Sequence, residues 1–269
     1  MPRTARGRAT ATATARVLNC EPSPNQENDW QFTHAVDAGL LAAGGALPST
    51  KDLRESWWQV GDQASTGSCV GWASAEGVLR WHFAGAGTLP KTARLSPRFI
   101  WMAAKETDPD TTQPTTMIET AGTYLKSALD VARKYGAIKD DLMPFASGQL
   151  YPGETKTFFA LAAQLKIASY FNLGTTLANW RSWLATKGPI LTRLGVDQTW
   201  DQATTTNGKL DTYLPNTVRG GHAVALVGYT ADRLIVRNSW GTGWGDKGFA
   251  YASFAYAQAA FTEAYGVTV

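Results

Sequence analysis

The cysteines and histidines of this chain are its first candidates for nucleophilic chemistry. Cys69 follows the small residues of the stretch T-G-S and precedes a predicted helix. The first turn of a helix has unpaired N–H groups and the positive end of the helix dipole, so a thiolate there is stabilised and its pKa falls. Such a nucleophile needs a nearby base, usually a histidine. A lone cysteine can also be an inert small side chain of the core, so the rest of the pattern must decide.

His222 is the histidine best placed to serve as that base. It follows two glycines and begins a predicted strand, whereas His34 lies in a predicted loop and His82 lies further along the Cys69 helix. Asn238 comes sixteen residues after His222, near the end of the next predicted strand. Neighbouring antiparallel strands can place these two side chains together, and an asparagine then fixes the tautomer and orientation of the imidazole. The pattern predicts a Cys–His–Asn set.

Gln63 and two tryptophans complete the predicted site. The Gln63 amide, six residues before Cys69, and the Cys69 backbone N–H can both donate to the oxyanion of a tetrahedral intermediate. Trp240 and Trp244 lie in the stretch N-S-W-G-T-G-W-G, whose glycines allow tight turns. We expect the indoles to keep water away from the His222–Asn238 hydrogen bond, which strengthens it. The alternative is a tryptophan-rich hairpin that only packs the core.

The elements that must position these residues change in character along the chain. Apolar periodicity predicts helices in the first part and short strands bounded by glycine and asparagine in the second. Ser96 and Pro97 suit the start of one helix, and Gly136 suits the end of another. This order predicts an α+β protein with a helical half, a sheet half and a cleft between them. The predicted helices are 69–84, 95–105, 123–136 and 177–189, and the predicted strands are 190–196, 222–229, 233–239 and 248–253.

Composition narrows the functional classes. The 269 residues are 44% hydrophobic and 17% charged, with a net charge of only +3 and no cluster of basic residues, which does not indicate a nucleic-acid partner. Two cysteines are too few for a disulfide scaffold, and the histidine spacing does not indicate a metal site. No run approaches the roughly 20 apolar residues of a membrane span. We expect no metal, no cofactor, no membrane partner and a monomer.

Three motifs together resemble the papain-like cysteine peptidases: Q-A-S-T-G-S-C at 63–69, G-H-A-V before G-Y at 221–229, and N-S-W-G-T-G-W-G-D-K-G-F at 238–249. Weaker similarity extends over about residues 48 to 255. The resemblance implies a two-lobed fold with a helical N-terminal lobe, an antiparallel or barrel-like sheet lobe, and the active site between them. It also implies an endopeptidase that acts through an acyl-thioester without metal or cofactor. Cys69 is then the nucleophile, His222 its general base and acid, Asn238 the orienting residue and Gln63 the oxyanion donor.

The resemblance also indicates where a peptide or protein substrate binds. Gly122 matches the second glycine of the pair that bonds the substrate backbone like an added strand. Small residues let a chain approach closely, and Ala223 makes its part of the wall small and apolar. The expected substrate-binding residues are Gly122, Ala121, Gly67, Gly221, Ala223, Trp240 and Trp244.

The chain departs from the family pattern at several positions. Val70 replaces the usual tryptophan, Thr66 stands at a common disulfide cysteine, and Ala121 replaces the first of the paired glycines. The missing disulfides indicate a bacterial-type, disulfide-free branch. A polar insertion at 199–217 is expected near the cleft, where it could restrict access.

Residues 1–45 are interpreted as an N-terminal arm before a peptidase domain at 46–269. The first sixteen residues contain four arginines and no acid, and they lack the apolar segment of a Sec signal, which leaves a cytoplasmic protein or a non-Sec route of secretion. They resemble a transit peptide in composition, but a flexible arm fits as well. We expect a short pro-segment or lid that holds the cleft inactive, and one further hypothesis is that Cys20 reaches Cys69 under oxidation.

Two other functional classes remain open on the sequence alone. A related acyl-transfer enzyme, such as a peptide ligase, a transglutaminase-like enzyme or a cell-wall amidase, would use the same catalytic set. A non-enzymatic binding module on an inactive peptidase fold would have lost a catalytic residue, and none is lost here. Substrate preference, and the choice between endo- and exopeptidase, depend on loops that the motifs do not specify.

Overall fold

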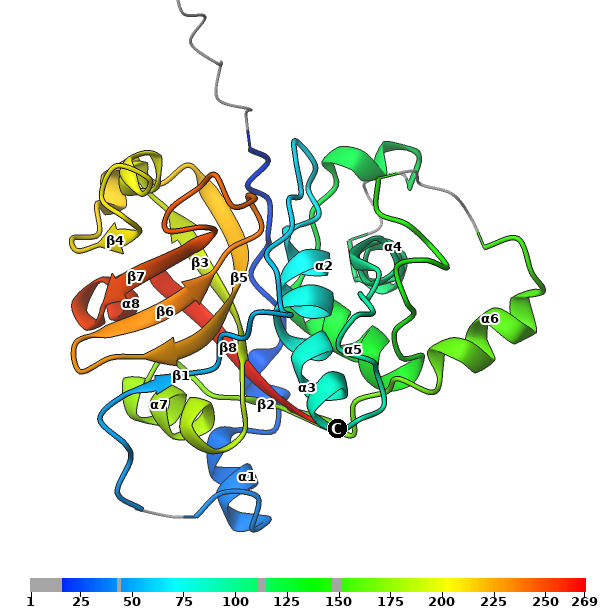
Figure 1. Cartoon of the computed structure of the whole chain (residues 1–269), viewed down its shortest axis with the longest axis horizontal. Helices are drawn as coiled ribbons and strands as arrows, with labels where there is room; N and C mark the ends of the chain where they lie inside the picture. Colours follow the sequence, from blue (N-terminus) through cyan, green and yellow to red (C-terminus); the bar gives the residue numbers. More distant parts are fainter. Residues whose placement is uncertain (1–15, 43–44, 111–114, 147–150) are drawn as a thin grey trace, which may run out of the picture.

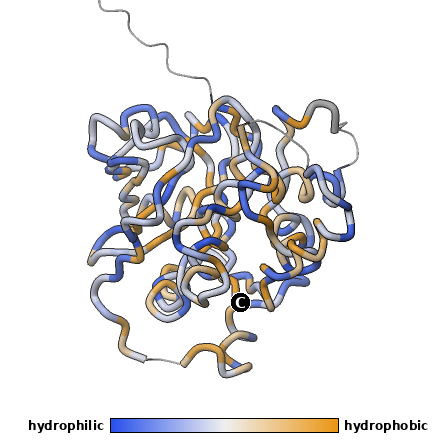
Figure 2. The backbone as a smooth tube through the Cα atoms, turned by 45° about the vertical axis from the view of Figure 1, so that its right-hand side comes forward, coloured by the Kyte–Doolittle hydropathy of each residue, from blue (hydrophilic) through white to orange (hydrophobic). Residues whose placement is uncertain are grey.

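A computed structural model describes residues 16–42, 45–110, 115–146 and 151–269. Figure 1 shows a helical half and a sheet half that face each other, with the N-terminal segment running between them. Hydrophobic segments gather in the interior of both halves, and hydrophilic segments lie mostly at the periphery (Figure 2). This is the α+β arrangement that the order of helices and strands predicted.

The helical half is built around one long helical stretch that begins at Cys69. It comprises α2 (Cys69–Ser74), a π-helical segment (Ala75–Leu79) and α3 (Arg80–Gly85). α4 (Pro97–Thr107) and α5 (Leu125–Lys134) pack beside it. A side chain at Gly71 would collide with the Pro97 carbonyl and with Trp101, so glycine lets α2 and α4 lie very close.

The predicted helix signals are present in the structure. The Ser96 hydroxyl accepts a hydrogen bond from the Phe99 N–H and caps α4, with Pro97 at the first helical position. The apolar face of α5 is buried, and Gly136 just beyond this helix has a φ of 101°, which suits glycine.

Within the described residues, eight strands form one sheet. They are β1 (Lys51–Asp52), β2 (Ser169–Asn172), β3 (Ile190–Val196), β4 (Lys209–Leu210), β5 (Gly220–Tyr229), β6 (Arg233–Arg237), β7 (Phe249–Ser253) and β8 (Phe261–Thr268). The strand order is β2-β8-β3-β5-β6-β7-β4, and β1 pairs with β5. All these pairs are antiparallel except β4 with β7, which run parallel. The predicted insertion at 199–217 therefore contributes an edge strand.

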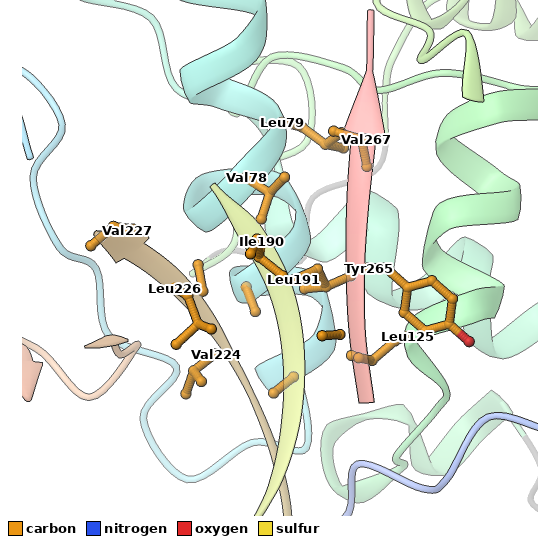
Figure 3. Packing of buried hydrophobic residues seen from close by; sticks show 14 of the residues in the cluster. Val78, Leu79, Leu125, Ile190, Leu191, Val224, Leu226, Val227, Tyr265 and Val267 are labelled. Atoms are coloured by element: carbon orange, nitrogen blue, oxygen red, sulfur yellow. The ribbon is translucent and has the colours of Figure 1, made fainter. Parts of the chain in front are cut away.

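The two halves share a core along the central helical stretch. Figure 3 shows Val78 and Leu79 of that stretch directed toward Ile190 of β3 and Val267 of β8. All four side chains are buried. A Cβ at Gly77 would lie 3.0 Å from the Ala225 side chain, so the helical stretch also lies close against β5. Burial on this scale fixes the start of α2 against the start of β5, which carry Cys69 and His222.

Further helices complete the fold, and among them only the helix at 177–189 was predicted. They are α1 (Phe32–Asp37), α6 (Thr155–Ala162), α7 (Leu177–Thr186) and α8 (Phe254–Ala260). The helix predicted at 177–189 ends at Thr186. α1 lies within the predicted N-terminal arm, and the neighbouring Gln31 forms a β-bridge with Asn172 of β2. α1 thus lies beside β2 of the sheet half, whereas residues 24–29 also contact Lys126 of α5 in the helical half.

Candidate active site

Cys69 is the predicted nucleophile. It is the first residue of α2 and is fully buried. The pKa of the Cys69 thiol lies well below its usual value. The largest cause is hydrogen bonding with the Cys20 thiol. Hydrogen bonding and charge attraction with His222, and hydrogen bonding with the Ala223 backbone, lower the pKa further. Burial acts in the opposite direction but does not prevail. The site therefore favours a thiolate at Cys69.

His222 and Asn238 are brought together by adjacent strands. His222 belongs to β5, and Asn238 directly follows β6, which pairs with β5. Nε2 of His222 lies 2.8 Å from Oδ1 of Asn238, and both residues are buried. The Asn238 Oδ1 also accepts a hydrogen bond of 2.8 Å from the Ser239 N–H, which holds the amide in place. Since Nε2 faces Asn238, the other ring nitrogen, Nδ1, is available for proton exchange with Cys69.

Tryptophan rings enclose the imidazole. The Trp240 ring centroid lies 5.0 Å from that of His222, at an interplanar angle of 35°. The ring centroids of Trp244 and Trp240 are 5.4 Å apart, so Trp244 extends the cover over His222 as expected from the motif. The turn between them depends on Gly241 and Gly245, which have φ values of 74° and 61°.

Trp200 is a third ring of this enclosure, and the sequence reasoning missed it. Its ring packs edge-on against the His222 ring, with 5.7 Å between the ring centroids, and stacks with the Trp244 ring at a centroid distance of 4.9 Å. Its indole N–H donates to the Tyr256 hydroxyl, which in turn donates to the Asp197 carboxylate. Trp200 lies in the insertion at 199–217, so a segment predicted to restrict access also supplies a buried wall of the site. A large aromatic residue inside an otherwise polar insertion was the available signal.

Gln63 is held in place by hydrogen bonds to Ser239 and Thr66. Its Oε1 accepts a 2.8 Å hydrogen bond from the Ser239 hydroxyl, and its backbone N–H donates to the Ser239 carbonyl. Nε2 donates one hydrogen bond of 2.9 Å to the Thr66 carbonyl. A glutamine amide has two N–H donors, so one remains for another acceptor. This arrangement suits a donor to an oxyanion.

Residues 16–23 run between the two halves of the molecule (Figure 1); we call this segment the cleft arm. Asn19 forms a parallel β-bridge with Gly221, and the Cys20 N–H donates to the Gly221 carbonyl at 3.0 Å. On the opposite wall, the Glu21 N–H donates to the Thr123 carbonyl at 3.2 Å. The cleft arm is thus hydrogen-bonded by its backbone to both walls.

Three of the predicted substrate-binding glycines face the cleft arm. A Cβ at Gly122 would lie 1.8 Å from the Asn19 carbonyl oxygen, and one at Gly67 would lie 2.7 Å from the Asn19 side chain. A Cβ at Gly221 would lie 2.1 Å from the Cys20 carbonyl oxygen. Glycine is required at Gly122 and Gly221 because the backbone of the cleft arm lies against them, and at Gly67 because the Asn19 side chain and the Ala121 carbonyl lie there.

Charged side chains also hold the cleft arm, and no motif in the sequence predicted these contacts. Arg16 donates to the Asp62 carboxylate at 2.6 Å and to the Trp240 carbonyl at 3.2 Å, and its guanidinium lies over the Trp240 ring. Further along, Nε of Arg193 donates to the Cys20 carbonyl at 2.8 Å. A carboxylate oxygen of Glu263 accepts the Ser23 N–H at 2.8 Å. Arg193 lies on β3 and Glu263 on β8, which pair with each other.

The other predicted wall residues have their side chains turned into the fold. Ala121 and Ala223 are buried, and the Ala121 carbonyl accepts the indole N–H of Trp101 at 3.0 Å. Trp244 is half-buried and donates to the Trp200 carbonyl. These residues shape the walls of the site.

Neither a metal cluster nor a membrane span is found in the described part of the chain. Within residues 16–42, 45–110, 115–146 and 151–269, no group of three or more histidine, cysteine or acidic side chains could hold a metal ion. In the same ranges, no helix has both the length and the apolar character needed to cross a bilayer.

Comparison with known proteins connects this geometry to one family. A family model described as "Papain family cysteine protease" matches residues 47–264. Cathepsin B-like CP3 of Giardia intestinalis is 28% identical over 230 residues, which cover 80% of this chain and 72% of the relative. The crystal structure of xylellain, a cysteine protease from Xylella fastidiosa, superposes with a TM-score of 0.75 at 21% identity and covers 94% of this chain and 96% of its own. Digestive procathepsin L2 from the larval midgut of Tenebrio molitor gives a TM-score of 0.69 at 19% identity, over 94% of this chain and 78% of that chain.

Proposed function

Because this chain belongs to the papain family of cysteine proteases, we propose that Cys69, His222, Asn238 and Gln63 carry out its peptide hydrolysis and that its cleft arm inhibits it. The observation that supports the catalytic assignment best is the buried 2.8 Å hydrogen bond between His222 and Asn238, next to a cysteine whose pKa is lowered. The family identity applies to the chain, and the roles of the individual residues are our proposal.

The proposed reaction begins with the thiolate of Cys69. It attacks the carbonyl carbon of the peptide bond, and His222 gives its proton to the departing amine. The acyl group is then held as a thioester on Cys69. A water molecule then attacks the thioester while His222 takes a proton from that water. The acid product is released and the thiol of Cys69 is restored.

Asn238 and Gln63 support these steps without exchanging protons. Asn238 accepts the Nε2–H of the imidazole and keeps Nδ1 directed at Cys69. The free N–H of the Gln63 amide and the backbone N–H of Cys69 donate to the oxyanion of the tetrahedral intermediate. The enclosure by Trp200 and Trp240 keeps water from the His222–Asn238 hydrogen bond and so strengthens it.

The cleft arm prevents this reaction in the full chain. It lies against Gly67, Gly122 and Gly221, the positions at which we expect a substrate backbone. With the cleft arm in place Cys69 and His222 are fully buried, so no substrate can reach them. We infer that the chain is a zymogen whose cleft arm must be displaced or removed. Membership of a bacterial-type branch stays a prediction.

Replacement of Cys69 tests the catalytic assignment. A variant lacking residues 1–22 should cleave an unfolded protein substrate, and the same variant with Cys69→Ser should lose that activity by at least about a thousandfold. Ser74→Ala, a buried residue further along α2, is the matched control and should retain activity. Mass spectrometry of the products should show internal cleavage, with one water added per bond broken. Undiminished hydrolysis by the Cys69→Ser variant would refute the assignment.

The same truncation tests inhibition by the cleft arm. Residues 24–42 must be retained, because Asp29 is buried and accepts a 2.8 Å hydrogen bond from the Tyr265 hydroxyl. We expect higher activity on a short fluorogenic peptide after removal of residues 1–22 than in the full chain. Equal activity of the two forms, at equal labelling by a thiol-directed epoxide inhibitor, would show that the cleft arm does not inhibit.

A further inference from the structure

The two cysteines of the chain meet inside the cleft. Cys20 and Cys69 are the chain's only cysteines, and both are free thiols. They are 49 positions apart in sequence, yet the chain around Cys20 contacts both walls of the site. The Asn19 side chain lies against Gly67, two residues before Cys69, and the Cys20 N–H donates to the carbonyl of Gly221, the neighbour of His222. Burial and the contact with the Cys69 thiol raise the pKa of Cys20. Both cysteines are almost completely buried, at 1% and 0% exposure. A residue of the cleft arm thus places a second sulfur directly at the proposed nucleophile.

The backbone of Cys20 is fixed from two directions. Its N–H donates to the Gly221 carbonyl at 3.0 Å, and its carbonyl accepts from Arg193 at 2.8 Å. The preceding residue, Asn19, lies against Gly122 on the opposite wall. These contacts keep the Cys20 side chain facing Cys69 whenever the cleft arm is seated.

We propose that oxidation joins Cys20 to Cys69 in a disulfide that locks the cleft arm over the active site and stores the nucleophile in a reversible form. This inference depends on the proposed function, because it takes Cys69 as the nucleophile and the cleft arm as its inhibitor. The product is a protease that needs both a reductant and displacement of the cleft arm before it acts.

A hydroperoxide such as hydrogen peroxide supplies the oxidising equivalents. When the cleft arm opens, the Cys69 thiolate attacks one peroxide oxygen, the O–O bond breaks, and Cys69 becomes a sulfenic acid while hydroxide leaves and takes up a proton as water. When the cleft arm returns, the Cys20 sulfur attacks the Cys69 sulfur. The S–O bond breaks, the S–S bond forms, and the thiol proton leaves with the hydroxyl group as a second water. A dithiol reductant reverses the product by thiol–disulfide exchange.

The two thiols differ in pKa in the direction that these reaction steps require. Hydrogen bonding with Cys20 and His222 lowers the pKa of Cys69, so Cys69 reacts first as a thiolate. Burial and the contact with Cys69 raise the pKa of Cys20, so Cys20 stays protonated and unreactive toward the peroxide. Cys20 then has the part of the resolving thiol, which captures the sulfenic acid before further oxidation makes it irreversible.

Peroxide treatment of the full chain tests the inference. Non-reducing peptide mapping of the treated wild type should find the Cys20 and Cys69 peptides joined, with a combined mass about 2 Da below their sum because two hydrogens are lost. Dithiothreitol should then restore most of the activity that the untreated protein shows after release of the cleft arm. In Cys20→Ser, Cys69 should be oxidised as far as the sulfinic acid. The activity that dithiothreitol restores, as a fraction of the untreated variant's activity, should be at least about fivefold lower than in the wild type. Val17→Ser, a control within the cleft arm that keeps both thiols, should recover like the wild type.

Two outcomes would overturn the inference. One is equal recovery of the wild type and Cys20→Ser with no joined peptide, and the other is a cross-link found only between two chains. The peptide map detects the disulfide without any activity measurement. A joined peptide in a chain whose hydrolysis survives Cys69→Ser would therefore refute the proposed function, whereas normal catalysis without a joined peptide would refute only the disulfide.

Discussion

Arg16 offers the sharpest test of how the cleft arm is held. It lies at the start of the described chain and reaches across the cleft to three different groups. Its guanidinium donates to Asp62 at 2.6 Å, to the Ala64 carbonyl at 2.9 Å and to the Trp240 carbonyl at 3.2 Å, and it lies 5.6 Å from the centroid of the Trp240 ring. Arg16→Ala removes all of these contacts and leaves the catalytic residues unchanged.

The size of the effect follows from the exposure of these contacts. The Asp62 side chain is 48% exposed, so its ion pair with Arg16 contributes only about 0.2–1 kcal/mol. The hydrogen bonds to backbone carbonyls contribute about 1 kcal/mol each, and the ring contact about 0.5 kcal/mol. Because neighbouring contacts are not additive, we expect a total of about 2 kcal/mol. This shifts the equilibrium between the seated and the open cleft arm by about 30-fold toward the open form.

Hydrolysis of a short fluorogenic peptide by the full chain measures this equilibrium. If the seated form dominates, kcat/KM should rise by the same factor of about 30 in Arg16→Ala, with the chain lacking residues 1–22 as the upper limit. Added salt should raise the activity of the wild type more than that of the variant, because screening weakens the exposed ion pair.

Arg133→Ala is the matched control for Arg16→Ala. It removes one positive charge and one partly exposed ion pair, that with Asp130 on α5. It should leave both the activity and its salt response unchanged. Indistinguishable activities of the Arg16 and Arg133 variants would refute this account of the cleft arm.

Three further predictions concern the site and the stability of the fold. Asn238→Ala in the chain lacking residues 1–22 should lower kcat by about 10²-fold and alter its pH profile, because the imidazole loses its orienting partner. Replacement of the exposed Asn207 by alanine is the control and should change neither. An unaltered kcat in Asn238→Ala would contradict the role of Asn238. Trp200→Ala should lower the free energy of unfolding by about 3–5 kcal/mol in denaturant titrations, since the ring is buried against His222, and a loss below 1 kcal/mol would contradict that packing. Burial lowers the pKa of His82 from 6.5 to about 4, so the unfolded chain takes up a proton at a higher pH than the folded chain does. The free energy of unfolding should therefore fall by about 2 kcal/mol between pH 7 and pH 5. Calorimetry should find a smaller fall in His82→Phe, and equal falls in the two proteins would contradict the assignment.

The arrangement of the proposed catalytic residues could be predicted because each of them has a strong local signal. Cys69 begins a periodic apolar helix, His222 lies on β5, and Asn238 directly follows β6, the next strand along the chain. Adjacent strands and a buried helix start leave few ways to arrange these residues. Ser96 and Pro97 set the start of α4 by local hydrogen bonding and a fixed φ, which do not depend on the rest of the fold.

The arm contacts could not be predicted because they are non-local and use mostly backbone atoms. Residues 16–23 show no periodicity, and their side chains gave no sign of which walls they would meet. Arg193 and Glu263 come from strands far apart in sequence, and β8, which carries Glu263, lies beyond the last predicted strand. Trp200 was missed for a related reason, since its burial depends on Tyr256 and on the rings around His222.

The tether of the cleft arm has a consequence for inhibition by added peptides. The arm is continuous with residues 24–42, which contact α5 through Lys126 and β2 through Gln31, so it never diffuses away from its own cleft. A short tether of this kind supplies an effective local concentration on the order of millimolar, whatever the dilution of the protein. A free peptide with the sequence of residues 16–23 would therefore compete poorly for the full chain at micromolar concentration, yet it could bind a molecule that has lost its own segment. Occupancy of the cleft should likewise be independent of protein concentration.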